Sequence, residues 1–111
     1  MTSEQTALVE RLRELFGAEP TLREVSMFGG RAFMVNEKMV VSASKDGSLL
    51  VRVDAGQHDT ILAEDGATQA TMGASRRDMG PGWIHVSPSA LAGDGLARWC
   101  DVALAYNRGT P

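Results

Sequence analysis

A stripe of leucines near the start of the chain predicts an amphipathic helix over residues 4–16. Charged residues occupy the other side of this helix. Ser3 is suited to cap its first turn, and Gly17 is suited to end it. The stripe is formed at helical spacing by Leu8, Leu12 and Leu15.

The hydrophobic pattern changes to a period of two after the glycine pair Gly29-Gly30. A short extended segment, residues 23–27, precedes the pair, and residues 31–54 predict three consecutive antiparallel strands. The first connection is a two-residue turn at Asn36-Glu37, where positive φ is needed; Asn36 tolerates it well and Glu37 less well.

These turns fix which residues face each other, and directly opposed residues share a face of the sheet. One face is then entirely apolar and is the predicted core side; it carries Ala32, Met34, Met39, Val41, Ala43, Leu49, Val51 and Val53. The opposite face is mixed; it carries Arg31, Phe33, Val35, Lys38, Val40, Ser42, Leu50 and Arg52.

The mixed face has an apolar centre formed by Phe33, Val40 and Leu50. Antiparallel sheets normally present a polar face to water, so this centre needs a cover. Either another part of the chain or another molecule could supply that cover. A register slip of one residue would exchange the two faces along a strand.

The second half of the chain predicts a capped helix, further strands and a final helix. Asp54 is suited to cap the middle helix. These elements, added to a helix and a three-stranded meander, indicate a two-layer α+β domain built on an antiparallel sheet. The expected segments are a helix at 55–64, a strand near 69–72, a strand at 83–87, a helical turn at 88–91 and a helix at 95–107.

Composition narrows the class of protein. The 111 residues, 43% of them hydrophobic, fit one domain spanning residues 1–111. The net charge of −3 offers no general attraction to nucleic acid or an anionic membrane. No segment reads as a signal peptide or reaches the roughly 20 apolar residues of a membrane span. The lone Cys100 fits a reducing compartment, and we expect a cytoplasmic protein.

No residue pattern indicates a catalytic site, a metal site or a cofactor site. His58 and His85 lack partners at the spacing of metal ligands, and Cys100 lies in a predicted helix without an evident activating base. The glycines form neither GxGxxG nor GxxxxGK between a strand and a helix. We therefore expect a protein that is not an enzyme and has no metal or cofactor site.

The turn at Gly29-Gly30 has two interpretations. Two residues without a Cβ let the chain reverse before the strand that begins at Arg31. Alternatively, the turn is a surface loop that contacts a partner through Phe28 and Arg31.

Five blocks of the sequence resemble the N-terminal domain of the TfoX/Sxy competence regulators. The resemblance runs through nearly the whole chain in order, with one departure: Glu37 stands where the family often has glycine. The blocks are residues 27–36 (MFGGRAFMVN), 39–41 (MVV), 46–53 (DGSLLVRV), 79–84 (MGPGWI) and 99–108 (WCDVALAYNR).

The resemblance implies a two-layer fold related to type III secretion chaperones, and a bacterial role in regulating competence-gene transcription beside a cyclic-AMP receptor protein. No catalytic residues are established for the family, so none is carried over. The full-length regulators also have a C-terminal helical domain. We interpret this chain as a stand-alone N-terminal domain.

Three hypotheses for function follow. The first is a non-enzymatic interaction module, expected to be a homodimer, that binds a protein partner or a second copy of itself through the mixed face. Its candidate residues are Phe28, Gly29, Gly30, Arg31, Phe33, Val40, Leu50, Arg52 and Trp83.

The other two hypotheses use different residues. A less favoured one is contact with nucleic acid in a transcriptional role, which requires arginines to converge on one face; they are Arg23, Arg31, Arg52, Arg76 and Arg77. The third is a small ligand-binding protein or enzyme with a pocket near Phe28, Arg31, Trp83 and His85.

Overall fold

The computed structural model describes residues 2–27, 29–72 and 77–109. Its helices are α1 (Ser3–Leu15), η1 (Ala55–Gln57), α2 (His58–Leu62), η2 (Pro88–Leu91) and α3 (Gly95–Gly109). Its strands are β1 (Arg23–Met27), β2 (Gly30–Val35), β3 (Lys38–Ala43), β4 (Leu49–Arg52), β5 (Ala67–Gln69), β6 (Thr71–Met72), β7 (Arg77–Asp78) and β8 (Trp83–Val86).

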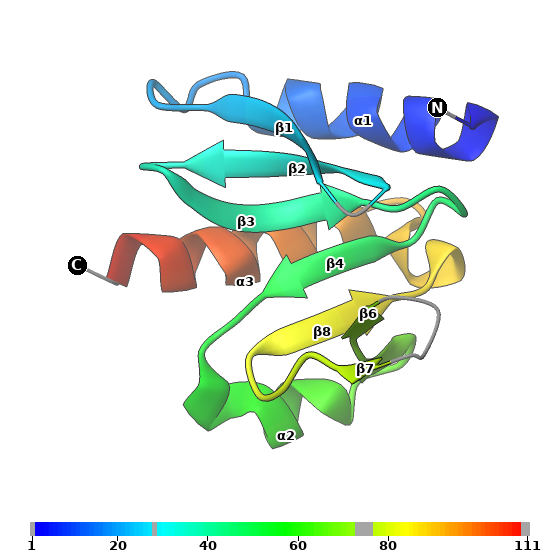
Figure 1. The fold of residues 1–111 in the computed structure, drawn as a ribbon, viewed down its shortest axis with the longest axis vertical. Helices are drawn as coiled ribbons and strands as arrows, with labels where there is room; N and C mark the ends of the chain where they lie inside the picture. Colours follow the sequence, from blue (N-terminus) through cyan, green and yellow to red (C-terminus); the bar gives the residue numbers. More distant parts are fainter. Residues whose placement is uncertain (1, 28, 73–76, 110–111) are drawn as a thin grey trace.

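Helices and strands form two layers, as the sequence predicts for an α+β domain. Six strands make one antiparallel sheet in the order β1-β2-β3-β4-β8-β5, and β6 and β7 form a separate two-stranded sheet. The long helices α1 and α3 lie behind the sheet in Figure 1, whereas β6 and β7 lie in front of it. No helix among the described residues crosses the front face of the six-stranded sheet (Figure 1); we call this face the open face.

The core lies between the sheet and the two long helices. The apolar side of α3 is buried there, including Trp99 and Ala103 at 0% exposure, and Leu8 and Leu12 extend the core from α1. Burying each large side chain stabilises the fold by about 1.5–3 kcal/mol. Phe16 packs on Phe33 with a distance of 5.7 Å between ring centroids, which links the end of α1 to β2.

A β-bulge in β3 changes the predicted faces of the meander. Met34 faces Met39 as predicted, but Val41 faces Phe33 instead of Ala32, because Val40 is an extra residue between the two pairs. Two residues on one strand then oppose one on the other, and the alternation of faces shifts there.

Three residues predicted for the mixed face lie in the core instead. Phe33 and Val40 are both 0% exposed and pack with the helices, so their assignment to the mixed face was wrong. Val35 is buried in the same core. Met39 and Leu50, by contrast, are partly exposed and line a cavity on the open face. Met39 and Met34 had been assigned to the core side.

Two of the predicted helices differ in detail from the observed ones. Thr2, not Ser3, is the N-cap of α1, and its hydroxyl accepts a hydrogen bond from the Gln5 amide at 3.1 Å. The predicted helix at 55–64 is a turn of 3-10 helix followed by the short α2. Asp54 caps it as expected, because its carboxylate accepts from the Gly56 amide at 2.9 Å.

The hairpin turn between β2 and β3 has the conformation that its residues predict. Asn36 and Glu37 both have positive φ, of 54° and 64°. This is the geometry whose twist matches that of the flanking strands. Asn36 adopts it at little cost, whereas Glu37 has a Cβ that disfavours it.

A buried histidine holds the turn that leads into β8. His58 Nδ1 accepts a hydrogen bond from the Gly82 amide at 2.9 Å, and its Nε2 lies 2.7 Å from Gln69 Oε1. The first bond requires Nδ1 to lack a proton, so Nε2 is the donor to Gln69. These bonds join α2, β5 and the 80–82 turn at one end of the sheet.

Candidate functional site

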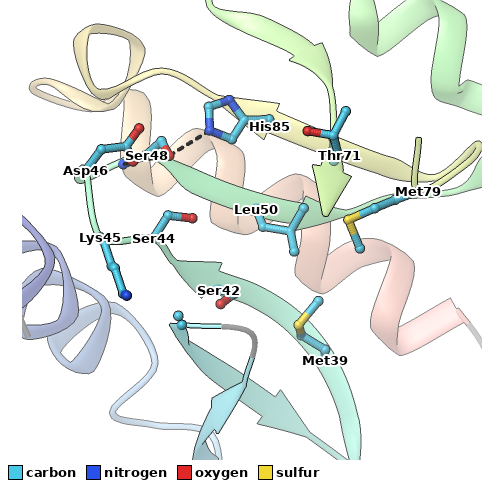
Figure 2. A pocket seen from close by; sticks show the side chains of 13 residues that line it. Met39, Ser42, Ser44, Lys45, Asp46, Ser48, Leu50, Thr71, Met79 and His85 are labelled. Carbon is cyan, nitrogen blue, oxygen red and sulfur yellow. Dashed lines mark hydrogen bonds between the residues drawn. The ribbon is translucent and has the colours of Figure 1, made fainter. Parts of the chain in front are cut away.

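A cavity of about 430 Å³ lies on the open face, over β3 and β4. Its floor comes from these two strands, and its walls come from β8, the β6 and β7 region, and the turns at residues 29–30 and 44–48 (Figure 2). The residues that line it are Gly29, Gly30, Met39, Ser42, Ser44, Lys45, Asp46, Ser48, Leu50, Ala70, Thr71, Met79 and His85. We call it the open-face cavity.

Alternation along β3 and β4 places the floor residues. Ser42 faces Leu50 across the two strands, and Leu50 faces His85 across β4 and β8, so these side chains share the open face. Met39 joins them because the bulge at Val40 resets the alternation. Met79 completes the apolar part from the opposite wall (Figure 2).

A chain of hydrogen bonds forms one rim of the cavity. His85 Nε2 lies 2.7 Å from Ser48 Oγ, and Ser48 Oγ donates to Asp46 Oδ1 at 2.5 Å. Because the serine proton goes to Asp46, Ser48 Oγ accepts from His85. The Ser48 amide also donates to Asp46 Oδ1 at 2.9 Å. The hydroxyl and amide bonds of Ser48 hold the pKa of Asp46 below its usual value.

The start of α1 holds the neighbouring part of the rim. The side-chain amide of Gln5 donates to the Ala43 carbonyl at 2.9 Å and to the Gly29 carbonyl at 3.3 Å. The Thr2 hydroxyl donates to the Lys45 carbonyl. Gln5 is 3% exposed, and with the exposed Thr2 it forms a clamp on both turns of this part of the rim. Gly29 has a φ of +79°, which supports the strand-entry interpretation of the glycine pair.

The cavity contains three of the nine candidate interaction residues from the sequence. Leu50 lies on the floor, and Gly29 and Gly30 lie at the rim. Phe33 and Val40 are in the core, as described above. Phe28 lies outside the described residues.

The other three candidates lie elsewhere. The Arg52 guanidinium stacks on the Trp83 ring, 4.6 Å from its centroid, and lies 5.4 Å from the centroid of Tyr106 on α3. Neither Arg52 nor Trp83 lines the open-face cavity. Arg31 lies near Glu24, whose pKa is lowered chiefly by the hydrogen bond from Arg13, with a further contribution from the charge of Arg31.

The predicted pocket near Phe28, Arg31, Trp83 and His85 does not coincide with the open-face cavity. His85 lines the cavity, but Arg31 and Trp83 do not. The Trp83 ring instead stacks against the Arg52 guanidinium, outside the cavity.

The arginines required for nucleic-acid contact do not form one cationic surface in the described parts of the chain. Arg23 is paired with Glu37 at 3.0 Å, Arg31 lies near Glu24, and Arg52 is stacked between two aromatic rings. Arg77 is exposed on β7, and Arg76 lies outside the described residues.

Two nucleophilic side chains, those of Ser48 and Cys100, are poorly placed for catalysis. Ser48 is 0% exposed and gives its proton to Asp46. Cys100 is 2% exposed in α3, and burial raises the pKa of its thiol to about 12. Across residues 2–27, 29–72 and 77–109, no three His, Cys, Asp or Glu side chains gather as metal ligands would.

None of the helices in the described part of the chain has the length and apolar character needed to cross a membrane.

Several cavity residues were not predicted from the sequence to belong to a site. Met39 was assigned to the core, and Thr71 and Met79 come from a region without a regular hydrophobic pattern. Ser42 was placed on the correct face but not recognised as part of a site. The run of Met39, Val40 and Val41 has no polar residue, which is the one local sign that alternation could fail there.

The comparisons with known proteins address the family. No curated protein matches this sequence. The family model of the TfoX N-terminal domain matches residues 14–106 of the 111, from the last turn of α1 to the last turn of α3. The match includes the whole six-stranded sheet and all the residues that line the cavity. It is not the model of an enzyme family. With the α+β fold and a match over most of its length, this chain belongs to the TfoX N-terminal domain family.

Proposed function

We propose that this domain is a non-enzymatic cytoplasmic module that recognises another protein through the open-face cavity. The observation that carries the proposal is the floor of the cavity. There Met39 and Leu50 are partly exposed at the centre of a sheet face that no helix covers. We place this contact in transcription regulation, the role that the family resemblance implies.

The chemistry of the cavity favours binding over catalysis. Its hydroxyl closest to a histidine, that of Ser48, is buried and bonded to Asp46. Its apolar side chains come from methionine and leucine, which are common at surfaces that adapt to protein partners. Burying Leu50 alone in an interface would contribute about 1.5–3 kcal/mol before the cost of association.

The test compares three forms of the protein as baits in extracts of the organism from which the chain comes. The forms are the wild type, Leu50→Asp in the cavity and Leu15→Asp on α1. Leu15 is 43% exposed and lies outside the cavity, so it controls for a new charge on an exposed leucine. Circular dichroism and thermal unfolding confirm that each form is folded.

We expect a protein that the wild type and Leu15→Asp retain and that Leu50→Asp loses. That protein is then purified, and its direct binding is measured by titration calorimetry with all three forms. Capture of the same proteins by all three baits would show that the cavity is not the binding surface. Sedimentation of each form identifies the case in which the lost partner is a second copy of this chain.

A small molecule is the second candidate occupant, and the size of the cavity favours it. A volume of about 430 Å³ lies within the range of about 300–1,000 Å³ that is usual for ligand pockets. A thermal-shift screen of metabolites separates this candidate from the first. A stabilising compound whose effect is lost in Leu50→Asp and kept in Leu15→Asp would replace the protein partner as the occupant.

A further inference from the structure

We infer that the partner segment bound in the open-face cavity carries a large apolar side chain next to a carboxylate. This inference rests on the proposed function and adds the chemistry of the partner to it. Two features of the cavity carry the argument: an apolar floor of adaptable side chains, and one lysine at its rim whose ammonium faces no carboxylate.

The apolar part of the cavity has room for a side chain from outside. Met39, Leu50 and Met79 come from three separate segments and all line the cavity (Figure 2). All three are partly exposed rather than buried, so they have not closed over one another. Methionine side chains have several rotatable bonds and adapt to the shape of an apolar group.

Lys45 supplies the charge at the rim. Its Nζ lies only 3.6 Å from the position that a Cβ on Gly29 would occupy, so the side chain lies along the Gly29 turn. Its ammonium forms no ion pair within 4.0 Å among the described residues, whereas Arg13, Arg23, Arg98 and Arg108 all do.

The neighbouring Asp46 does not neutralise Lys45 directly. Its carboxylate accepts two hydrogen bonds from Ser48 within its own turn, and in Figure 2 it points away from Lys45. These bonds keep Asp46 ionised and oriented towards Ser48 and His85. Lys45 is therefore the cation left to meet a charged group that enters from outside.

Together these features fit a peptide better than a nucleic acid. A nucleic-acid site requires several cations along a phosphate backbone. Lys45 is the one lysine or arginine that lines this cavity; the other side chains that line it are those of methionine, leucine, alanine, serine and threonine, with Asp46 and His85 bonded to Ser48 at the rim. An aliphatic or aromatic anchor on the floor, with an aspartate or glutamate beside it, would satisfy both the apolar floor and Lys45.

The test is a selection from a displayed library of random decapeptides with the purified full chain as bait. Enriched peptides are synthesised, and their affinities are measured by fluorescence anisotropy at low and high salt. The variants are Lys45→Ala, Lys45→Glu and Leu50→Asp. Arg77→Ala is the matched control, because Arg77 is an exposed cation that does not line the cavity.

We expect enriched peptides to place an acidic residue beside a large apolar one. Lys45→Ala should weaken binding about twofold to fivefold at low salt and by less at high salt, as for an exposed ion pair. Lys45→Glu should enrich basic residues in place of acidic ones. Leu50→Asp should weaken binding by at least about tenfold, and Arg77→Ala should leave it unchanged.

The inference is overturned if the wild type enriches no peptides, if the enriched peptides lack an acidic residue, or if Lys45→Glu keeps the same preference. An equal loss in Arg77→Ala and Lys45→Ala also overturns it, because it would indicate a general charge effect. The proposed function can still hold in these cases, when a natural partner is lost with Leu50→Asp. If Leu50→Asp changes neither the peptide binding nor the natural partner, both proposals fail.

Discussion

Replacing Gly82 by alanine tests how tightly the end of the sheet is packed. Gly82 has a φ of +90°, and a Cβ there would lie 2.4 Å from Arg52 Nη1 and 2.9 Å from the Val53 carbonyl oxygen. The positive φ costs about 1–3 kcal/mol for a residue with a side chain. Val53 cannot move away easily, since its amide donates to the Gly82 carbonyl at 2.8 Å.

The second contribution comes from Arg52. A methyl group at residue 82 would push its guanidinium off the Trp83 ring, where it lies 4.6 Å from the centroid. Loss of such stacking costs about 0.5–2 kcal/mol. Alanine also stiffens the unfolded chain, which offsets about 0.4–1 kcal/mol of this loss. We therefore expect Gly82→Ala to lower the free energy of unfolding by about 0.5–4.5 kcal/mol. Urea unfolding followed by circular dichroism and tryptophan fluorescence measures it.

Gly80→Ala is the matched control for Gly82→Ala. Gly80 has nearly the same φ, +89°, but a Cβ there would meet no heavy atom within 4 Å. Its substitution should show the backbone effect alone, about 1–2 kcal/mol. The reasoning is refuted if Gly82→Ala costs no more than Gly80→Ala, because the contacts with Arg52 and Val53 would then contribute nothing.

Three further predictions concern single side chains. Glu37→Gly should raise the free energy of unfolding by about 0.5–1 kcal/mol, because glycine adopts the observed φ of +64° without strain; equal urea midpoints would contradict this. The lowered pKa of Asp46 means that its stabilisation is present above the unfolded-state pKa near 4 and is lost as pH falls through the folded-state pKa. Asp46→Asn should therefore reduce the loss of stability between neutral and acidic pH in pH-dependent urea unfolding, and an unchanged acid profile would contradict this. Cys100, buried and with a thiol pKa raised to about 12, should react with a thiol reagent at pH 8 only after unfolding in urea; rapid labelling of the folded protein would contradict its burial.

Much of the fold follows from local sequence patterns. The first two leucines of the stripe in α1, the cap at Asp54 and the Asn36-Glu37 turn each depend on neighbouring residues alone, and each is confirmed. The third leucine of the stripe, Leu15, is 43% exposed and lies outside the core. The order of the meander strands follows from those short turns. Local chemistry was sufficient to predict these elements.

The faces of the meander were harder to predict than its strands. Residues 39–41 are all apolar, so alternation gives no information about which of them faces the core. The bulge at Val40 lets two adjacent valines, Val40 and Val41, pack in the core, because both α1 and α3 lie over that part of the sheet. That arrangement depends on how the helices pack, which the strand sequence does not contain.

The cavity was predicted only in part, because some of its residues are also positioned by the packing of distant segments. Leu50 lies on β4, where the register follows directly from the preceding turn, and its place on the mixed face is correct. Thr71 and Met79 reach the cavity from short strands and turns whose position depends on tertiary contacts. One such contact is the set of bonds from the side-chain amide of Gln69 to the carbonyls of Ala70, Gly80 and Trp83.

The clamp formed by Thr2 and Gln5 has a practical consequence for every binding assay proposed above. A fusion tag joined ahead of Thr2 would be attached beside the cavity rim, where Thr2 bonds to Lys45 and Gln5 bonds to Gly29 and Ala43. Such a tag could shield the rim or alter the α1 cap. Immobilisation through the opposite end of the chain leaves this rim accessible, and comparing the two tag positions would itself report on where the partner binds.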